Sequence, residues 1–544
     1  MKRRNFIKLS ATASALALMP FELEAMLKSA RLTGCDYANR KLILINLAGA
    51  NDGLNTVIPL NQYDLYSALR PTIKVPESGV NPYINLDSTL SSDQLVGLNP
   101  AMTGFKSLYD QGWLRLVQSV GYPSQNKSHF ASTDLYMTGN DGNSLSNGSQ
   151  SGWIGRFMEQ HYSDELGATY PLAIQIGSLS NSLGFHGVEE HGMSMNLTNQ
   201  DPSGFYSVIN GLGGQPPLNI ADTDFGTEMK YLVETDKLAN IYAQSVSSTF
   251  NSGNNVHAYP DTDIADQLKT VARLISGGLE SKVYMVKIGG FDTHNAQVET
   301  SGEAAGKHYD LLKQLSDAVG AFCADLTSLG VADDVVGLTY SEFGRKAKEN
   351  GNLGTDHGEI APMFVFGKGV EGGVSGTNPD LTEAEDSNNY QIQSVQYDYR
   401  QVFGTLLQSF MGAGNAVIDE TFFDHTNTQS FSDLAMNELL KDDFEITESC
   451  QSNSITEISN DDQVGAWSVS PNPCGDTINL RCEEDVDSVL VELITSSGRT
   501  AINESYSLSN GLVLIDITYL KSGVYVLKIN SETVKTERIK IVKR

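Results

Sequence analysis

The chain has 544 residues, of which 40% are hydrophobic and 19% are charged, enough for one large folded domain and a smaller one. Its 66 Asp and Glu outnumber its 37 Lys and Arg, and the formal net charge is −29. This balance excludes nucleic-acid binding through a broad basic surface, because phosphate contacts need clustered cations. The five scattered cysteines exclude a disulfide scaffold and a thiolate metal cluster; Cys474 and Cys482 are close enough for one local bridge or for two free thiols.

The N-terminal segment has the features of an export signal. Residues 1–30 begin with the basic "MKRR" and continue with an apolar, small-residue stretch that is too short for a lasting membrane span. Arg3 and Arg4, followed by "NFIK", resemble a twin-arginine signal. Leu32–Cys35 ("LTGC") is similar to a lipoprotein cleavage box, but charged residues separate it from the apolar stretch. A lipid anchor is therefore the less favoured alternative.

Between residues 36 and 446, β-forming runs alternate with helical patterns. The expected strands are near-continuous apolar runs, which are typical of a parallel sheet buried on both faces: Lys41–Gly49, Leu114–Gly121, Tyr170–Gly177, Ser281–Gly290, Asp334–Ser341 and Pro362–Gly369. The expected helices have apolar residues at three- and four-residue spacing: Glu228–Thr249, Asp263–Gly277, Gly306–Leu329 and Tyr399–Met411. This alternation predicts a doubly wound, mainly parallel α/β fold. Such sheets place ligands beyond the carboxyl ends of their strands.

Acidic and histidine residues follow four of these strands. In chain order they are Asp52, then His129 after Ser128, then Asp292 and His294, and finally Glu342, Asp356 and His357. Carboxylates and imidazoles together suit zinc, manganese or iron better than magnesium or calcium alone. The sequence therefore predicts a divalent-metal site, with zinc or manganese favoured, whose ligands are Asp52, Asp292, His294, Glu342, Asp356 and His357.

Each motif also has an ordinary structural interpretation. Asp-x-His is more often a hydrogen-bonded turn than a ligand pair, and "TDHG" can be a turn in which glycine takes positive φ. Ser128 can be a helix N-cap or a nucleophile at a helix N-terminus. Arg345 can steady a substrate anion or form a structural salt bridge. The coincidence of these residues at strand ends favours a site.

The C-terminal part changes character. Residues 447–464 are polar and lack apolar periodicity, as in a linker. Residues 465–544 contain short alternating strands separated by turns, which predict a small β-sandwich. The stretches "SPNP", "SSGR", "LKSGVYVLKI" and the basic end resemble the C-terminal sorting domain of the type IX secretion system of Bacteroidota. A carbohydrate-binding or adhesion domain is the alternative.

The large domain resembles an uncharacterised family of twin-arginine-exported, sulfatase-like proteins in the alkaline-phosphatase superfamily. The stretches that carry the resemblance are "NLAGANDGLNTVIPL", "VGYPSQNKSHFASTDLYMTG", "GGFDTHNAQ", "LTYSEFGRKAKENGNLGTDHGEIAPMFVFGKGVEGG" and "DYRQVFGTLL". The resemblance implies two divalent metals around a nucleophile, for which Ser128 is the best match. The superfamily usually has adjacent Asp-His after the fifth strand, whereas this chain has Glu342-Phe343. Either Asp356 and His357 replace that function, or one metal site is altered or missing.

These features predict a secreted or cell-surface protein that crosses the periplasm. Its partners would be the twin-arginine translocase, the type IX machinery and a small-molecule or polysaccharide ester. The expected function is metal-dependent hydrolysis of phosphate or sulfate esters, with Ser128 and Arg345 as catalytic residues. The alternative is a non-catalytic surface protein with the same fold and a binding or assembly role.

Overall fold

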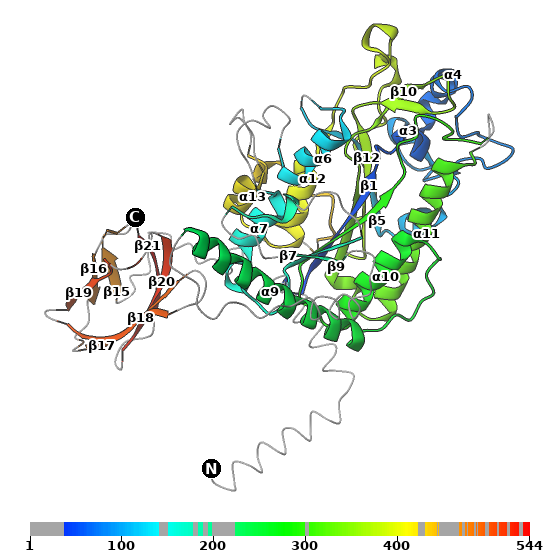
Figure 1. Cartoon of the computed structure of the whole chain (residues 1–544). Coiled ribbons are helices and arrows are strands. Elements are labelled where there is room, and N and C mark those ends of the chain that lie inside the picture. The colour runs from blue at the N-terminus through cyan, green and yellow to red at the C-terminus, as the bar shows by residue number, and fades with distance from the viewer. Residues whose placement is uncertain are drawn as a thin grey trace. The chain divides into compact units, whose positions relative to one another are not determined.

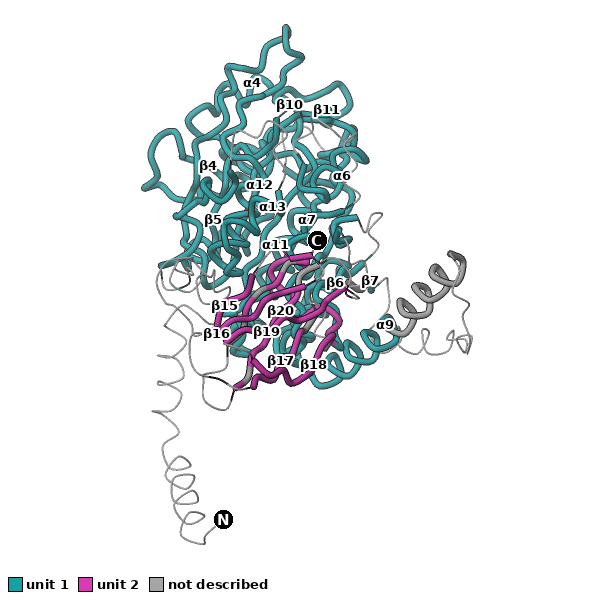
Figure 2. Tube along the Cα trace, turned by 90° about the vertical axis from the view of Figure 1, so that its left-hand side faces the viewer, with its two compact units in different colours: residues 1–158, 169–453 teal, residues 159–168, 454–544 magenta. Residues whose placement is uncertain are grey.

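The protein divides into two compact units, which Figure 2 colours separately: residues 1–158 with 169–453, and residues 159–168 with 454–544. The computed structural model describes residues 37–140 except 38 and 124, 151–177, 183–188, 194–197, 224–299, 304–422, 430–444 except 443, and 467–543 with short gaps. The predicted signal peptide, the cleavage box and the linker at 447–464 lie outside the described residues.

The large unit is built on a mixed sheet. Its strand order is β13-β5-β12-β9-β1-β8-β6-β7, and β14 pairs with β5. In chain order these strands are β1 (Lys41–Ala48), β5 (Leu114–Gly121), β6 (Ala173–Ile176), β7 (Ser194–Leu197), β8 (Val283–Gly289), β9 (Val335–Tyr340), β12 (Ala361–Phe366), β13 (Gly373–Ser375) and β14 (Tyr397–Asp398).

The prediction of a mainly parallel sheet is confirmed, with one exception. β1 pairs in parallel with both β8 and β9, whereas β12 runs antiparallel to β5 and β9. An apolar run marks a buried strand but carries no information about its direction. Because β1, β8 and β9 are parallel neighbours, their carboxyl ends meet at one edge of the sheet.

Helices lie on both faces of this sheet (Figure 1). Alternate residues of β1 pack into one hydrophobic cluster with α5 (Thr103–Asp110), α10 (Asp263–Ser276) and α11 (Lys307–Ser328). On the opposite face, Tyr340 of β9 lies against Tyr136 of α6 (His129–Thr138) and Phe403 of α12 (Tyr399–Thr405). The sheet is therefore buried on both sides, as its near-continuous apolar strands require.

The helices form where their sequences favour them. In α10, Ile264, Leu268, Val271 and Ile275 are buried at three- and four-residue spacing, and acidic residues in its first turn favour the N-terminal end of the helix dipole. The predicted helix at 399–411 begins at Tyr399, but its second half is a π-helix, Leu406–Phe410. The other α-helices among the described residues are α3 (Gly53–Thr56), α4 (Tyr63–Leu69), α7 (Trp153–His161), α9 (Asp224–Ser252) and α13 (Asn415–Thr421).

Two small sheets complete the large unit. β2 (Val57–Pro59), β4 (Val96–Leu98) and β3 (Ile84–Asn85) form an antiparallel sheet, and β10 (Arg345–Glu349) pairs with β11 (Thr355–His357) in a hairpin. None of the helices in the described ranges is both long and apolar enough to span a membrane.

The small unit contains two antiparallel sheets, whose alternating buried residues belong to one hydrophobic cluster. One sheet has β15 (Trp467–Ser470), β16 (Thr477–Cys482) and β19 (Leu512–Asp516); the other has β18 (Thr500–Ser507), β17 (Ser488–Thr495), β20 (Gly523–Asn530) and β21 (Glu537–Lys543). Cys474 and Cys482 are both buried, and the structure has no disulfide bridge between them.

The burial of β1 gives a stability prediction. Ile43 is fully buried in the core cluster, so Ile43→Ala should lower the free energy of unfolding by about 3 kcal/mol through lost apolar burial and a cavity. Urea unfolding of the purified chain measures this change. Val80 is 58% exposed, and Val80→Ala should change the same quantity by less than about 0.5 kcal/mol. Equal effects of the two substitutions would contradict the assigned core.

Candidate metal centre

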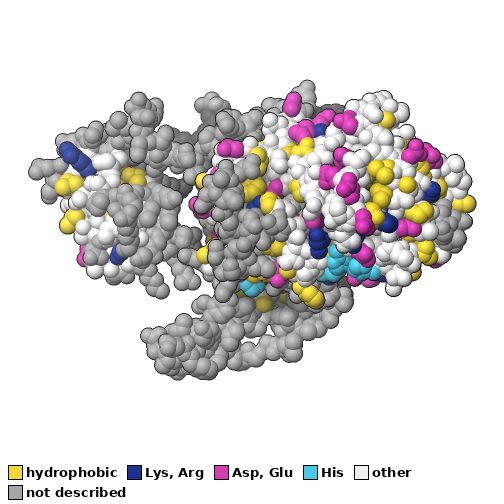
Figure 3. Space-filling model, turned by 90° about the horizontal axis from the view of Figure 1, so that it is seen from above, with side chains coloured by type: hydrophobic (Ala, Val, Ile, Leu, Met, Phe, Trp, Pro, Cys, Tyr) yellow, Lys and Arg dark blue, Asp and Glu magenta, His cyan; other side chains and the backbone are white. Residues whose placement is uncertain are grey.

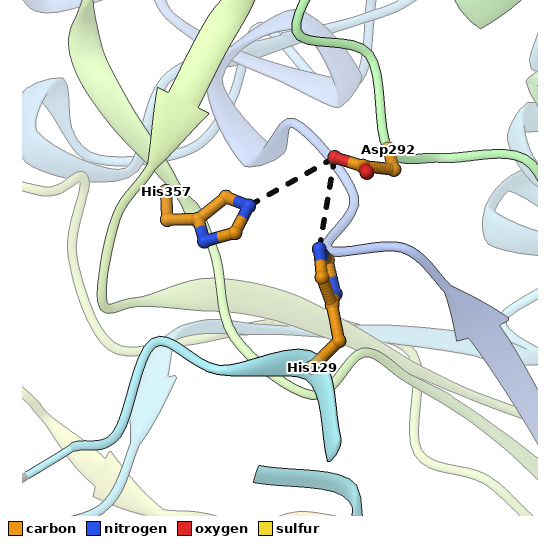
Figure 4. Close-up of side chains that lie close together, drawn as sticks. All are labelled: His129, Asp292 and His357. Atoms are coloured by element: carbon orange, nitrogen blue, oxygen red, sulfur yellow. Dashed lines mark ion pairs between the residues drawn. The ribbon is translucent and has the colours of Figure 1, made fainter. Parts of the chain in front are cut away.

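Three of the predicted metal ligands and one further histidine converge at the carboxyl edge of the sheet. Asp292 and His294 lie in the turn that follows β8, His129 is the first residue of α6, and His357 is the last residue of β11. Figure 4 shows the rings of His129 and His357 pointing toward the Asp292 carboxylate from two different elements. Seen from above, histidine side chains reach the surface together, next to basic and acidic side chains (Figure 3).

The Oδ1 atom of Asp292 is the centre of this arrangement. The Nε2 atoms of His294, His129 and His357 lie 3.3, 3.6 and 3.8 Å from it. Ligand atoms of His129, Asp292 and His357 all lie within 4.8 Å of one another. His294 adjoins this group, since its Nε2 lies 2.8 Å from the Nε2 of His357. Three imidazole nitrogens of the same type therefore lie around one carboxylate oxygen.

Each imidazole is held through its other nitrogen. The Nδ1 atom of His129 lies 2.8 Å from Oε1 of Glu342, and that of His357 lies 2.8 Å from the carbonyl oxygen of Lys127. The Nδ1 atom of His294 lies 3.4 Å from Oδ1 of Asp356. Partners of this kind orient a ring and direct Nε2 toward a metal. Glu342 and Asp356, which were predicted as ligands, thus contact the Nδ1 atoms of two imidazoles, on the side away from Asp292.

Two glycines allow other segments to approach the turn after β8 that carries Asp292 and His294, called here the ligand turn. Gly49 has φ of +113°, and a Cβ there would lie 2.3 Å from the backbone nitrogen of Asp292. A Cβ on Gly354 would lie 2.4 Å from the carbonyl oxygen of Thr293. Because Gly354 has no side chain, the β10–β11 hairpin can contact the ligand turn. Gly358, the glycine of "TDHG", does not have positive φ, so that stretch is not a turn with a left-handed glycine.

Arg345 joins three of these loops from within the protein. Its side chain is fully buried, and it donates hydrogen bonds to the carbonyl oxygens of Ala50 (2.7 Å) and Thr355 (2.9 Å) and to Oδ1 of Asp292 (2.7 Å). Its other partners include the carbonyl oxygens of Gly49 and Phe291. The guanidinium therefore holds the loops together and touches the acidic group of the centre.

The pKa shifts of Asp292 and His357 favour the forms that bind metal. Burial raises the pKa of Asp292, but the Arg345 hydrogen bond and charge, with the nearby imidazoles, outweigh it and hold this pKa below its usual value. Burial lowers the pKa of His357, which favours its neutral ring. The hydrogen bond to Glu342 raises the pKa of His129. Metal ligation needs an ionised carboxylate and neutral imidazoles, so Asp292 and His357 are already suited to it.

The donor set fits a divalent ion. The Nε2 atom of His129 is buried and has no hydrogen-bond partner in the structure, which is costly unless a ligand satisfies it. Donors about 2.1 Å from a tetrahedral zinc ion lie roughly 3.4 Å apart, close to the 3.3–3.8 Å distances to Asp292. The rings of His294 and His357 need to separate by about 0.6 Å to match this spacing. Side chains of His294 and Asp292 are 43% and 49% exposed, so an ion can enter from solvent.

Asp52 does not lie in this group. It is fully buried and paired with Arg70 at 2.6 Å, and it accepts a hydrogen bond from Gln297 at 2.6 Å. Burial raises the pKa of Asp52, but the charge and hydrogen bond of Arg70 outweigh this effect, and the pKa lies below its usual value. Both carboxylate oxygens are therefore occupied by donors of the protein.

Ser128, the predicted nucleophile, and Phe343, the neighbour of the predicted ligand Glu342, have different surroundings. Ser128 is exposed, directly precedes α6, and makes no side-chain capping hydrogen bond, so its hydroxyl is not used as an N-cap. Phe343 is fully buried, with its ring 4.9 Å from that of His129 and 4.7 Å from that of His357. Its aromatic ring cannot bind metal, but it forms a wall against which two of the imidazoles pack.

Sequence analysis did not assign roles to His129, Arg70 or Gln297. His129 follows a predicted strand, as the predicted ligands do, and that position was a usable signal. Arg70 lies outside the strand ends and belongs to no motif, whereas Gln297 ends the quoted stretch "GGFDTHNAQ". Only the packing of α4 and of the ligand turn against Asp52 reveals their contacts.

Comparison with family models gives two matches. Residues 234–422 match the model described as "Protein of unknown function (DUF1501)", and residues 468–544 match "Secretion system C-terminal sorting domain". The first match contains Asp292, His294 and His357 but begins after His129, and its description assigns no activity. The second confirms the predicted C-terminal sorting domain. A search of curated proteins gives no match.

Solved structures with similar features include three bacterial proteins. They are the lipoteichoic acid synthase LtaP from Listeria monocytogenes (8% identity, 72% of this chain and 76% of that chain, TM-score 0.31), the PsFucS1 sulfatase from Pseudoalteromonas sp. (11%, 92% and 89%, 0.32) and a protein in the alkaline phosphatase superfamily from Vibrio parahaemolyticus (10%, 92% and 82%, 0.30). At these identities and TM-scores, the likeness assigns no function to the chain.

The contact between Glu342 and His129 gives a prediction about metal affinity. Glu342→Gln removes the negative charge behind the ring, so zinc should bind about 10- to 100-fold more weakly. Competition with a chromophoric chelator measures the dissociation constant. Asp110 is a surface carboxylate paired with Lys106, and Asp110→Asn is the matched control that should leave affinity unchanged. Equal zinc affinity of the two variants would show that Glu342 does not support a metal-binding ring.

A buried histidine beside Asp52 gives a prediction about acid stability. Burial lowers the pKa of His308 to about 4, whereas an unfolded histidine has a pKa near 6.5. Between these values the unfolded chain binds a proton that the folded chain does not, so stability falls as pH decreases from about 6.5 to 4. Protonation of His308 alone should lower the free energy of unfolding by roughly 3 kcal/mol over that pH range.

His308→Gln tests this contribution, because glutamine can still donate to Oδ1 of Asn51, the partner of His308 Nε2 at 2.9 Å. Urea unfolding at several pH values should show a smaller loss of stability in the variant than in the wild type. Parallel losses in both proteins would rule out His308 as a source of acid sensitivity.

Proposed function

We propose that this protein is an exported, metal-dependent hydrolase of phosphate or sulfate esters. The observation that carries the proposal is the convergence of three imidazole Nε2 atoms on Oδ1 of Asp292. His129, Asp292 and His357 hold the ion, and His294 is the fourth ligand. A donor set of three nitrogens and one oxygen favours zinc, with manganese as the second choice.

The other predicted residues act around this centre. Glu342 and Asp356 orient His129 and His294, and Arg345 positions Asp292. When bound, the divalent ion supplies positive charge that screens the oxygens of the ester. The open side of the centre admits an ester group of a small molecule or of a polysaccharide at the protein surface.

Ser128 is the proposed nucleophile. It is exposed beside His129 at the start of a ten-residue helix, where backbone N–H groups and the helix dipole favour an incoming anion. Its hydroxyl oxygen bonds to the phosphorus or sulfur atom as the ester alcohol leaves with the hydroxyl proton. Water then cleaves the new bond, which releases phosphate or sulfate and restores the serine.

Export is the second part of the proposal. The sorting domain at residues 468–544 supports secretion to the cell surface through the type IX machinery, and its two antiparallel sheets suit the predicted β-sandwich. The basic N-terminal "MKRRNFIK" supports delivery to the periplasm by the twin-arginine translocase. A protein that crosses the inner membrane already folded can carry an ion acquired in the cytoplasm.

The activity is tested with zinc- and manganese-loaded protein and a panel of aryl phosphates and sulfates. Turnover is expected with at least one ester and should be abolished by chelation. Ser128→Ala should lower kcat at least 100-fold with unchanged metal content, since nucleophile loss removes most of the catalysis. Ser92 is another exposed serine, at the start of a short 3-10 helix, and Ser92→Ala should retain full activity.

Two other outcomes would change the conclusion. Metal-loaded protein that is inert to every ester would favour the non-catalytic alternative, a surface protein in which one ion ties the loops together. Turnover that is equal in Ser128→Ala and wild type would retain the hydrolase and reject Ser128 as its nucleophile.

A further inference from the structure

A second position in the large unit has the surroundings of a cation site. Five oxygen atoms surround the guanidinium of Arg70: both carboxylate oxygens of Asp52, the side-chain oxygen of Asn55, and the carbonyl oxygens of Lys346 and Ala347. All accept hydrogen bonds from Arg70 at 2.6–2.9 Å. Such an all-oxygen set also suits a hard divalent ion.

The positive charge of Arg70 is fixed in this position. Arg70 and Asp52 are both fully buried, and arginine keeps its proton in proteins. A metal ion at Asp52 would have to displace the guanidinium and leave a buried charge without its partner, which is strongly unfavourable. The pair therefore blocks the first predicted metal ligand.

The same network supports the histidine centre. Gln297 donates to Oδ2 of Asp52, and its Oε1 accepts from Thr293 at 2.9 Å and from Thr355 at 3.1 Å. Thr293 stands between Asp292 and His294, and Thr355 lies two residues before His357. Asp52 thus contacts both ligand-bearing segments through a single amide side chain.

We infer that the Arg70 guanidinium permanently fills the cation position at Asp52, so that the chain binds one divalent ion, at the histidine centre, and not two. Asp52 acts as a positioning residue for the ligand segments. This inference rests on the metal centre of the proposed function and deepens it, since an ester would then meet a single metal ion.

Metal stoichiometry of the purified full chain tests the inference directly. After equilibration with excess zinc and removal of free ion, elemental analysis of the wild type should give one zinc per chain. With manganese, the electron paramagnetic resonance spectrum should be that of an isolated ion, because two ions roughly 4 Å apart would be magnetically coupled. Two zinc ions per chain, or a coupled manganese spectrum, would overturn the inference.

A paired substitution separates positioning from ligation. Asp52→Asn with Arg70→Gln removes both buried charges together, so neither is left unpaired. This double variant should retain one zinc with a dissociation constant within about tenfold of the wild type, in the range of outer-shell effects. His357→Ala, which removes a ligand, should weaken zinc binding more than 100-fold.

The outcomes distinguish failure of this inference from failure of the proposed metal centre on which it rests. Loss of zinc from the double variant, with an intact circular-dichroism spectrum, would make Asp52 a ligand and overturn the inference while the metal centre stands. A wild-type chain that binds no zinc and no manganese would reject the metal centre itself. If the double variant does not fold, the wild-type stoichiometry and manganese spectrum still decide between one ion and two.

Discussion

The buried guanidinium of Arg345 is the constraint on which the centre depends. It connects the turn after β1, the turn after β8 and the start of β11, three segments that are far apart in sequence. A planar group with five donors can bind several carbonyl oxygens in fixed directions, which a lysine ammonium cannot reproduce. Its charge is balanced by Asp292, the carboxylate around which the imidazoles gather. One side chain thus links loop geometry to the electrostatics of the site.

The histidine centre is organised in two layers. Its inner layer consists of Nε2 atoms and one carboxylate oxygen, and its outer layer consists of Glu342, Asp356 and the Lys127 carbonyl oxygen. Outer partners fix the orientation of each ring, so binding an ion requires little reorganisation. Phe343 adds an apolar wall behind two of the rings. Glu342 and Phe343 therefore give the centre an orienting carboxylate beside a packing surface.

Asp52 and Asp292 show how the same residue type serves different purposes. Asp292 is 49% exposed and faces three imidazoles, whereas Asp52 is fully buried against Arg70. A half-exposed carboxylate can exchange water for an ion, but a buried ion pair cannot open without a large desolvation cost. The chain thus contains one buried carboxylate paired with an internal cation and one carboxylate that is open to solvent. The two are joined through Gln297.

Much of the fold and part of the candidate site were predictable from sequence, because these properties depend only on local patterns. Apolar runs identify strands whatever their neighbours are, and β5 has the predicted bounds Leu114–Gly121. Because neighbouring parallel strands end at the same edge of a sheet, the sequence also predicted that Asp292, His294 and His357 lie at one edge. The C-terminal sorting domain was equally evident, since its turns and alternating strands are local.

Other features were decided only by the tertiary structure. Whether Glu342 touches a metal or the back of His129 depends on side-chain directions that no spacing encodes. The pairing of Asp52 with Arg70 arises because α4 packs against β2 and β10, which brings Arg70 to Asp52. The reversed direction of β12 depends on the path of its connections. A sequence determines which chemical groups are available near a strand end. Their division into ligands, orienting partners and buried counter-charges follows from atomic distances of a few ångströms, which exist only after the loops have packed.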